Sequence, residues 1–313
     1  MSAILVQIPG LFTTVQDLGR EGFGPIGVSA SGAADPVSLR IGNRLVGNPQ
    51  GAAGLEMTLV GGAFAFEQAA VIAVTGADFG PSLDGIPVAM WTSIEIHKGQ
   101  TVTLGPSRSG ARAYLCIQGG MDVEPFLGSA STHVLSGLGG FEGRPLRTGD
   151  RLELGAANSL FHKGSLSPKV LESLQPRKLI RVTGGPQSDW FPNSSWKTLC
   201  ESTFRVAEQS NRMGIRLEGP AIPLDPSREM ITEGVSLGAI QVPPSGQPII
   251  LFVEQQTTGG YPKIANVISA DLHSLGQLRP RDAIRFERIE MSEARSLLIH
   301  QEELMASKEL FQE

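Results

Sequence analysis

Cysteine and long apolar runs are scarce in this sequence. It holds only two cysteines in 313 residues, too few for a disulfide framework in a chain of this size. Cys116 lies in the apolar run YLCIQ, where a buried free thiol is expected. This cysteine usage predicts a reducing, cytoplasmic location. No run approaches 18 consecutive apolar residues, and MSAILVQIPG has no basic segment before a long apolar core, so we expect neither membrane insertion nor export.

Sequence patterns for metal binding and covalent catalysis are also missing. The histidines form no H-x-x-x-H or H-x-H pair, and there is no C-x-x-C, so we predict no metal site. A serine hydrolase elbow, G-x-S-x-G, is absent, and neither cysteine has a catalytic context. There is no G-x-x-x-x-G-K-[ST] phosphate loop, so use of ATP requires another nucleotide-binding fold or another subunit. The five histidines are His97, His133, His162, His273 and His300.

The composition describes a globular chain that does not bind nucleic acid. The net charge is -5, and no basic cluster is interleaved with aromatic residues. Hydrophobic residues make up 41% and charged residues 18%, with 38 glycines and 21 prolines, which favours many turns and argues against disorder. The length allows two domains of ordinary size or one large domain.

Short apolar or alternating runs bounded by Gly, Pro, Asp or Ser predict strands along most of the chain. In one repeated pattern, a turn with Gly or Arg and then Gln or Asp leads into an alternating strand: HKGQTVTLG, RTGDRLELG and RPRDAIRFE. The expected strands lie in FAFEQ, AAVIAVTG, TSIEIHKG, TVTLG, ARAYLCIQGG, DRLELG, LIRVTGG, PIILFVEQ and AIRFERI.

Helices are expected at three places. One begins at Asp35, an N-cap followed by proline, and ends near Gly47 and Asn48. A shorter one lies around residues 264–275. A terminal helix is predicted in MSEARSLLIHQEELMASKELFQE, because apolar residues recur there at spacings near 3.6. Those residues are Ala294, Leu297, Leu298, Leu304, Met305 and Phe311.

The stretch 156–176 has little strand pattern and two prolines, so it is the best candidate for a domain boundary. We therefore predict a mainly β protein with two barrel-like or sandwich-like domains and few helices. The first domain is expected at residues 1–165. The second is expected at 176–313, with the terminal helix.

Residues 22–27, GFGPIG, match the G-x-G-x-x-G template of a dinucleotide-binding loop. That template needs backbone N–H groups at the phosphates and a helix that begins at once. Pro25 has no N–H to donate, and the next helix start is at Asp35 and Pro36. We therefore interpret the hexapeptide as an irregular glycine-rich loop, which leads on to SGAAD.

Polar residues in the first half form one candidate binding cluster. Gln16, Asp17 and Arg20 stand in TTVQDLGR, Ser31 in SGAAD, and Asp78 in TGAD after an apolar strand. Structural roles are equally open, because Asp35 suits an N-cap and Asp17 with Arg20 suits a turn-stabilising ion pair. We predict that Gln16, Asp17 and Arg20 line a polar cleft.

The segment FVEQQTTGGYPKIANV forms the second candidate cluster. Amide and hydroxyl groups beside two glycines suit a planar amide or ureide, which needs donors and acceptors close to backbone. We expect Lys263 to anchor a carboxylate or ureide oxygen, Asp17 or Tyr261 to handle a proton, and Arg212 to add a positive charge. The remaining binding residues expected in this cluster are Gln256, Thr257, Thr258, Gly259 and Gly260.

Eleven motifs, in order, resemble the biotin-dependent carboxyltransferase family, also called allophanate hydrolase subunit 2. The likeness extends from about residue 10 to residue 290. Ala130 and Asn211 depart from it, because arginine and aspartate are common there. The motifs are TTVQDLGR, SGAAD, NRLVGN, LEMTLVGG, TGAD, YLCIQGG, GSAST, GGFEGR, SNRMGIRL, GAIQVP and TTGGYPKIANV.

This resemblance implies tandem cyclophilin-like β-barrels that act with companion subunits. It implies, first, a subunit of an ATP-dependent 5-oxoprolinase, whose substrate is a lactam with a carboxylate. A second possibility is a carboxyltransferase component acting on urea or a related amide. A third is a non-catalytic module that antagonises a kinase inhibitor. No A-M-K-M site occurs, so we expect no covalently bound cofactor, biotin only on a partner, and ATP use by the complex.

Overall fold

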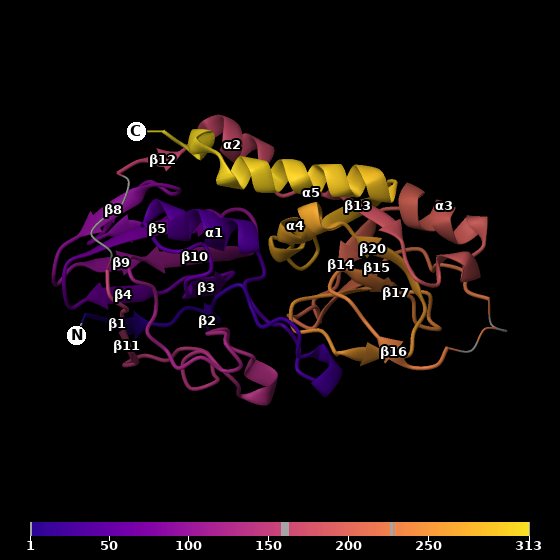
Figure 1. Ribbon diagram of the computed structural model, residues 1–313, viewed down its shortest axis with the longest axis horizontal. Coiled ribbons are helices and arrows are strands. Elements are labelled where there is room, and N and C mark those ends of the chain that lie inside the picture. The colour runs from indigo at the N-terminus through magenta and orange to yellow at the C-terminus, as the bar shows by residue number, and fades with distance from the viewer. Residues whose placement is uncertain (1, 158–162, 226–227, 229, 313) are drawn as a thin grey trace. The chain divides into compact units, whose positions relative to one another are not determined.

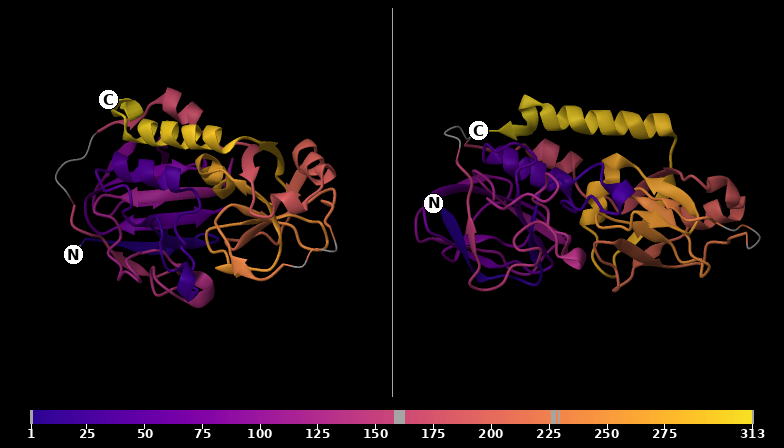
Figure 2. Two further views of the ribbon diagram at one scale, coloured as in Figure 1. Left: turned by 45° about the vertical axis from the view of Figure 1, so that its right-hand side comes forward. Right: turned by 60° about the horizontal axis from the view of Figure 1, so that its bottom comes forward.

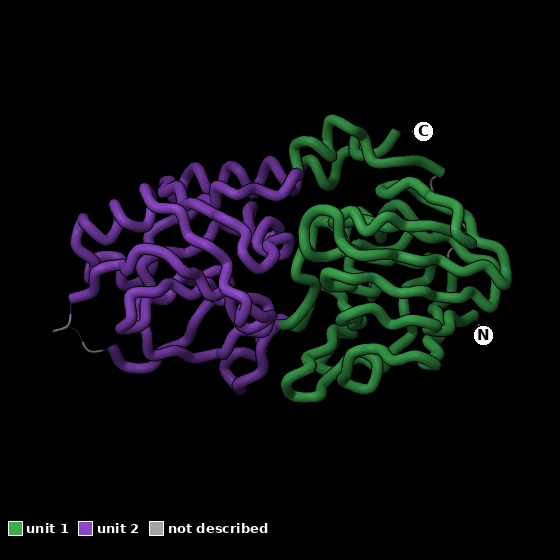
Figure 3. Tube along the Cα trace, turned by 180° about the vertical axis from the view of Figure 1, so that it is seen from behind, with its two compact units in different colours: residues 1–20, 31–174, 304–313 green, residues 21–30, 175–303 purple. Residues whose placement is uncertain are grey.

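The chain folds into two compact units (Figure 3). The computed structural model describes residues 2–157, 163–225, 228 and 230–312, so His162 lies outside the described residues. Unit 1 comprises residues 1–20, 31–174 and 304–313, and unit 2 comprises residues 21–30 and 175–303. The main division, between residues 174 and 175, falls inside the stretch 156–176. Each unit also includes one short segment from beyond that division: residues 304–313 belong to unit 1 and residues 21–30 to unit 2.

Unit 1 is built on two antiparallel sheets (Figure 1). The first has the order β11 (Arg151–Glu153), β1 (Ala3–Ile8), β4 (Ala63–Phe66), β9 (Thr101–Thr103), β6 (Ser82–Leu83) and β7 (Ile86–Pro87). The second has the order β2 (Thr13–Gln16), β3 (Gly54–Thr58), β10 (Arg112–Ile117), β5 (Ala70–Gly76) and β8 (Ser93–Ile96). A short pair joins β12 (Ser165–Leu166) to β22 (Phe311–Gln312).

The second sheet of unit 1 is covered on both faces, which explains why β10 reads as a continuous apolar run. Leu115 and Ile117 join the core shared with the first sheet. Tyr114 and Cys116 point to the opposite face, where helix α1 (Pro36–Leu45) packs (Figure 2). Every residue of β10 is therefore buried. The other helical elements of unit 1 are η2 (Val134–Ser136), α2 (Pro168–Ser173) and η5 (Lys308–Leu310).

The helix expected at Asp35 is confirmed. The Asp35 carboxylate accepts hydrogen bonds from the Ser38 N–H and hydroxyl, and Pro36 takes the first helical position. The buried free thiol expected at Cys116 is also confirmed. Burial raises the pKa of this thiol far above its ordinary value, so it is an inert packing group beneath α1.

Unit 2 is built on a closed barrel of seven strands. All neighbouring pairs are antiparallel except β13 with β21, which are parallel. Around the barrel the order is β13 (Leu179–Gly184), β20 (Lys263–Val267), β17 (Ala239–Gln241), β18 (Ile249–Leu251), β15 (Gly214–Glu218), β14 (Phe204–Val206) and β21 (Ala283–Arg288). A separate two-stranded ribbon pairs β16 (Glu233–Gly234) with β19 (Thr258–Gly259).

Helices of unit 2 are short except for α5 (Met291–Ala306), which begins in unit 2 and ends in unit 1. Ala294 packs against Ile268 and Ala270 in unit 2, and Met305 joins the α1 core of unit 1. The other helical elements are η1 (Gly24–Ile26), η3 (Ser188–Trp190), α3 (Asn193–Glu201), η4 (Ser269–Asp271) and α4 (Leu272–Gly276).

Two helix predictions need correction. Residues 264–267 belong to strand β20, where antiparallel pairing with β13 and β17 in the barrel overrides local helical preference, and the α-helix there is only Leu272–Gly276. The terminal helix is confirmed, but it ends at Ala306. Phe311 instead forms the short strand β22, paired with β12.

The mainly β fold is confirmed, and each of the nine runs named from the sequence contains a strand. The closed barrel lies in unit 2, whereas unit 1 is a pair of sheets with helical cover. Within the described part of the chain, no helix has both the length and the apolar character needed to cross a membrane. The GFGPIG segment forms the 3-10 turn η1, and α1 starts only at Pro36.

The three repeated turns share one hydrogen-bond pattern. In each four-residue turn, the side chain of the fourth residue accepts a hydrogen bond from the backbone N–H of the first residue. The backbone N–H of the fourth residue donates in turn to the carbonyl of the first. The side-chain bonds join His97 to Gln100 (2.8 Å), Arg147 to Asp150 (2.7 Å) and Arg279 to Asp282 (2.8 Å). The third residue of each turn has a positive φ: 89° at Gly99, 91° at Gly149 and 71° at Arg281.

We expect Gly149→Ala to lower the free energy of unfolding by about 1 kcal/mol. No atom lies within 4 Å of the added Cβ, so the cost comes from the backbone conformation alone. Guanidinium titration measures the change. The matched control is Gly51→Ala, also in unit 1, where φ is not positive and the nearest atom is 3.4 Å away. Equal losses in the two variants would contradict this account of the turn.

Candidate functional site

The Asp17 carboxylate fixes the first candidate loop inside unit 1. It accepts hydrogen bonds from the hydroxyls of Ser129 (2.6 Å) and Ser131 (2.5 Å). It also accepts bonds from the backbone N–H groups of Gly19 and Ala130, both at 2.7 Å. Four donors therefore surround a carboxylate on a residue only 9% exposed. This arrangement holds the end of β2 against residues 129–131.

Gln16 and Arg20 are buried beside Asp17. The Arg20 guanidinium donates to the carbonyls of Phe126 and Ser131 and lies over the Phe126 ring. Gln16 donates through Nε2 to Thr14 and to the Thr132 carbonyl. Its Oε1 atom is buried without a partner among the described residues. Gln16, Asp17 and Arg20 are thus brought together, in a tightly bonded loop of unit 1.

A buried polar network that the sequence reasoning missed supports the SGAAD segment. The Tyr114 hydroxyl donates to Glu56 (2.7 Å) and accepts from the Asp35 N–H (2.8 Å). Glu56 also accepts from the Ala34 N–H at 2.8 Å. Burial, and next the charge of Glu56, hold the pKa of Tyr114 well above its ordinary value, so the phenol remains a donor. Ser31 opens this segment with φ 55° and a buried hydroxyl that has no partner among the described residues.

Asp78 has partners of its own, away from the Asp17 loop. Its carboxylate accepts from the Gly80 N–H at 2.7 Å and lies 3.5 Å from the Arg108 guanidinium. Both side chains are largely exposed. A turn-stabilising role explains these contacts, and they do not connect Asp78 with Gln16, Asp17 or Arg20.

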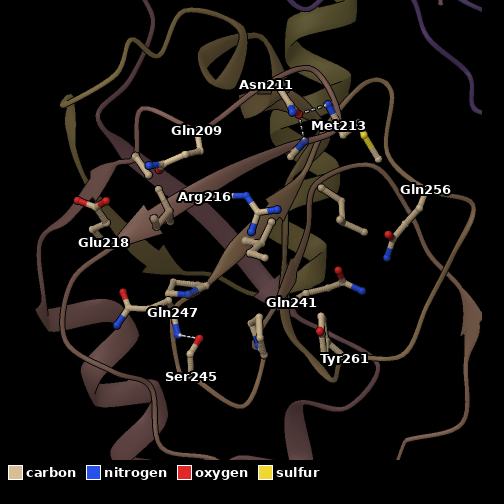
Figure 4. Close-up of a pocket in the computed structure, with 17 residues that line it drawn as sticks. Gln209, Asn211, Met213, Arg216, Glu218, Gln241, Ser245, Gln247, Gln256 and Tyr261 are labelled. Atoms are coloured by element: carbon tan, nitrogen blue, oxygen red, sulfur yellow. Dashed lines mark hydrogen bonds between the residues drawn. The ribbon is translucent and has the colours of Figure 1, made fainter. Parts of the chain in front are cut away.

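In unit 2, a cavity of about 470 Å³ is lined by strands β15, β17 and β18 and the loops beside them (Figure 4). Tyr261 contributes a phenol, and Arg216 and Glu218 are the charged lining residues. Two of the residues predicted from FVEQQTTGGYPKIANV, Gln256 and Tyr261, are therefore brought to one cavity. Five amide side chains line it: Gln209, Asn211, Gln241, Gln247 and Gln256.

Gln241 is one of several lining residues that the sequence reasoning missed, and Arg216 is another. Gln241 stands on β17, only 2% exposed, and its Nε2 atom is buried without an acceptor among the described residues. A Cβ at Gly259 would lie 2.4 Å from this atom and 2.9 Å from Nε2 of Gln256. The glycine therefore leaves room for two amide groups that approach the backbone of β19. A polar residue in the buried strand of GAIQVP was the available sequence signal.

Lys263 is buried rather than exposed in the cavity. Its Nζ atom lies 2.7 Å from the Glu233 carboxylate, and Gln187 donates to the same carboxylate at 2.9 Å. The Lys263 N–H donates in turn to Gln187 at 3.1 Å. The hydrogen bond from Lys263, followed by that from Gln187, holds the pKa of Glu233 below its ordinary range. Lys263 is 1% exposed, so this carboxylate supplies the countercharge that burial requires.

The other predicted residues of unit 2 have mainly structural contacts. Arg212 forms a buried ion pair with Glu254, with 2.5 Å between Nε and Oε1. Thr258 and Gly259 form β19, paired with Gly234 and Glu233. The Thr257 carbonyl accepts from Val235, which extends the same ribbon, and a Cβ at Gly260 would meet only Thr232 at 3.4 Å.

The cavity offers chemistry for a small planar polar molecule. Amide groups provide both donors and acceptors, the phenol can donate or accept, and the guanidinium provides a positive charge. Among the described residues, no group of three or more histidine, cysteine, aspartate or glutamate side chains is placed to hold a metal ion. The arrangement therefore favours binding by hydrogen bonds.

Comparisons with known proteins agree on one family. The family model for the carboxyltransferase domain, subdomain A and B, matches residues 26–288. The chain is 40% identical over 287 residues to the C subunit of 5-oxoprolinase from Escherichia coli (strain K12), covering 91% of each protein. It is 35% identical over 316 residues to urea amidolyase of Saccharomyces cerevisiae, covering 95% of this chain and 17% of that relative.

A solved structure is similarly close. The crystal structure of the Kluyveromyces lactis urea carboxylase superposes with a TM-score of 0.91 at 34% identity. The match covers 99% of this chain and 30% of that protein. Sequence and fold thus agree over most of the chain, which belongs to the carboxyltransferase family defined by subdomains A and B.

Proposed function

We propose that this chain is a subunit of an ATP-dependent 5-oxoprolinase and acts with companion subunits. The observation that carries the proposal is the 40% identity to the C subunit of 5-oxoprolinase, which extends over 91% of both proteins. The urea amidolyase match instead covers 17% of a much longer relative. Because the chain has no phosphate loop, we assign ATP binding to a companion subunit.

The cavity of unit 2 is our candidate for the lactam site. Hydrolysis of 5-oxoproline adds water to the ring carbonyl carbon, breaks the C–N bond and leaves an amine and a new carboxylate. The unpartnered Nε2 of Gln241 is suited to donate to the ring carbonyl. Tyr261, 43% exposed at the cavity wall, is our candidate for proton handling.

For Asp17 and Lys263 we propose structural roles in place of direct contact with substrate. Asp17 already accepts four hydrogen bonds, which supports a positioning role for the loop of unit 1 rather than proton transfer. Lys263 is ion-paired with Glu233, which supports a role in fixing the β16–β19 ribbon and its electrostatics. For the remaining predicted binding residues, only Gln256 has its side chain in the cavity wall.

A second candidate function is carboxyl transfer from carboxybiotin to urea or a related amide. The superposition with urea carboxylase at a TM-score of 0.91 favours it. An amide-lined cavity also suits urea, since both its carbonyl and its N–H groups need partners. This function needs a biotin-bearing partner, because the chain has no biotinylation motif.

Reconstitution separates the two candidates. We expect the chain, mixed with the companion subunits encoded beside it, to support 5-oxoproline-dependent release of ADP and glutamate, and we expect omission of the chain to abolish both. Coupled ADP detection and amino-acid analysis measure the products. Full activity without the chain contradicts the proposal. Transfer of labelled carboxyl from carboxybiotin to urea, without glutamate formation, favours the second function.

Gly259→Ala tests the cavity. The added methyl displaces the amide ends of Gln241 and Gln256, which are flexible, so we expect kcat/KM of the reconstituted enzyme to fall about tenfold with Tm nearly unchanged. The control is Gly234→Ala on the paired strand, where no atom lies within 4 Å of the new Cβ. If Gly259→Ala is as active as the control, these amides do not contact substrate.

Glu233→Gln tests the ion pair between buried Lys263 and the half-exposed Glu233. A carboxyl with a lowered folded-state pKa adds stability above its unfolded-state pKa and loses it as pH falls through the folded value. Because solvent screens the 44% exposed Glu233 side chain, we expect the variant to be less stable at pH 7 by at most about 1 kcal/mol, and the difference to vanish in acid. Denaturant titrations across pH measure it, with the exposed pair Glu208 and Arg281 providing the control Glu208→Gln. A pH-independent difference would contradict the assignment.

A further inference from the structure

Arg216 brings a positive charge to the cavity without forming an ion pair there with any described residue. It stands on β15 and is exposed, and its guanidinium has neither an ion pair nor a hydrogen bond among the residues that the structure describes. Figure 4 shows this guanidinium in the middle of the lining residues, with Gln241, Gln256 and Tyr261 to the right of it in that view. The cavity is thus ready to receive a negative group.

The neighbouring strands explain why no carboxylate pairs with Arg216. Across β18 its partner in the ladder is Ile249, and on the other side the N–H of Ala207 donates to its carbonyl. Both neighbours are apolar. The one carboxylate of the cavity wall, Glu218, stands two residues further along β15, and no ion pair or hydrogen bond joins it to Arg216 among the described residues. Arg216 is therefore the one cationic group among the described residues of the cavity wall, and its donors remain available to a ligand.

A second unsatisfied group lies in the same wall. Gln241 is 2% exposed and its buried Nε2 donor has no acceptor among the described residues. Buried donors normally have a partner, so this amide is suited to an acceptor on a ligand. The Arg216 guanidinium offers two parallel N–H donors for a carboxylate, and the Gln241 amide offers one donor for a carbonyl. A volume of about 470 Å³ suits a small molecule.

We propose that Arg216 binds the carboxylate of the substrate and makes the site selective for a small amide that carries one. The inference rests on the function proposed above, because it places the amide substrate in this cavity. A planar guanidinium holds a carboxylate through two parallel hydrogen bonds, which an ammonium group does not reproduce. The carboxylate then orients the ligand so that its amide carbonyl meets Gln241. An uncharged amide such as urea lacks this anchor.

Ligand titrations of the full chain test the assignment. Wild type and Arg216→Met are titrated with 5-oxoproline, with 2-pyrrolidinone, which is the same ring without the carboxylate, and with urea. Backbone-amide NMR shifts report Kd. The control is Arg285→Met, an exposed arginine on β21 of the same barrel that does not line the cavity. Arg216→Lys is added to separate the loss of charge from the loss of the fork.

We expect wild type and Arg285→Met to bind 5-oxoproline about 10 to 100 times more tightly than 2-pyrrolidinone or urea. The preference should disappear in Arg216→Met and be only partly kept in Arg216→Lys. An unchanged preference in Arg216→Met, equal affinity of wild type for the three ligands, or no saturable binding overturns the inference. These titrations need no companion subunit, so their outcome is distinct from failure of the reconstituted enzyme to hydrolyse 5-oxoproline.

Discussion

The buried ammonium group of Lys263, on barrel strand β20 of unit 2, is the constraint on which the candidate cavity depends. A charge at 1% exposure must be paired, and Glu233 supplies the pair at 2.7 Å. Glu233 belongs to β16, whose register places it opposite Gly259 on β19. The ion pair therefore fixes Gly259 against the amides of Gln241 and Gln256. One buried charge thus determines the position of one side of the cavity.

Unit 1 uses a carboxylate in a comparable way. Asp17 is surrounded by two hydroxyls and two backbone N–H groups, all within 2.7 Å. Glu56 and Tyr114 do the same for the SGAAD segment, through bonds to the backbone of Ala34 and Asp35. Because an unpaired buried polar group is costly, such networks specify one loop conformation. The motif residues Asp17, Glu56 and Tyr114 therefore fix the conformation of the polar loops of unit 1.

Much of the fold was predictable because its signals are local. The nine apolar runs become strands, and the repeated turn before β9, β11 and β21 was visible as a pattern of Gly or Arg followed by Gln or Asp. Barrel pairing is not local. It placed residues 264–267 in β20, where we expected a short helix, and pairing with β12 placed Phe311 outside the terminal helix. No local signal marks the short segments 21–30 and 304–313 that belong to the other unit.

The same distinction between local and non-local signals applies to the candidate site. Gln256 and Tyr261, which line the cavity, could be proposed from the sequence because a dense polar loop after a strand is a local signal. Gln241 was missed because a single amide in a buried strand has many structural explanations. The partners of Arg212 and Lys263, which are Glu254 and Glu233, are 42 and 30 residues away along the chain. Spacing alone does not show that these cations are already neutralised.

That neutralisation decides which cation can recognise a substrate. Arg212 and Lys263 have carboxylate partners, and a ligand carboxylate would have to displace them at a desolvation cost. Arg216 has apolar neighbours on both adjacent strands and faces the cavity. If Arg216 binds the substrate carboxylate, selectivity for a charged amide over urea depends on a strand residue and not on the dense polar loop that the sequence singles out.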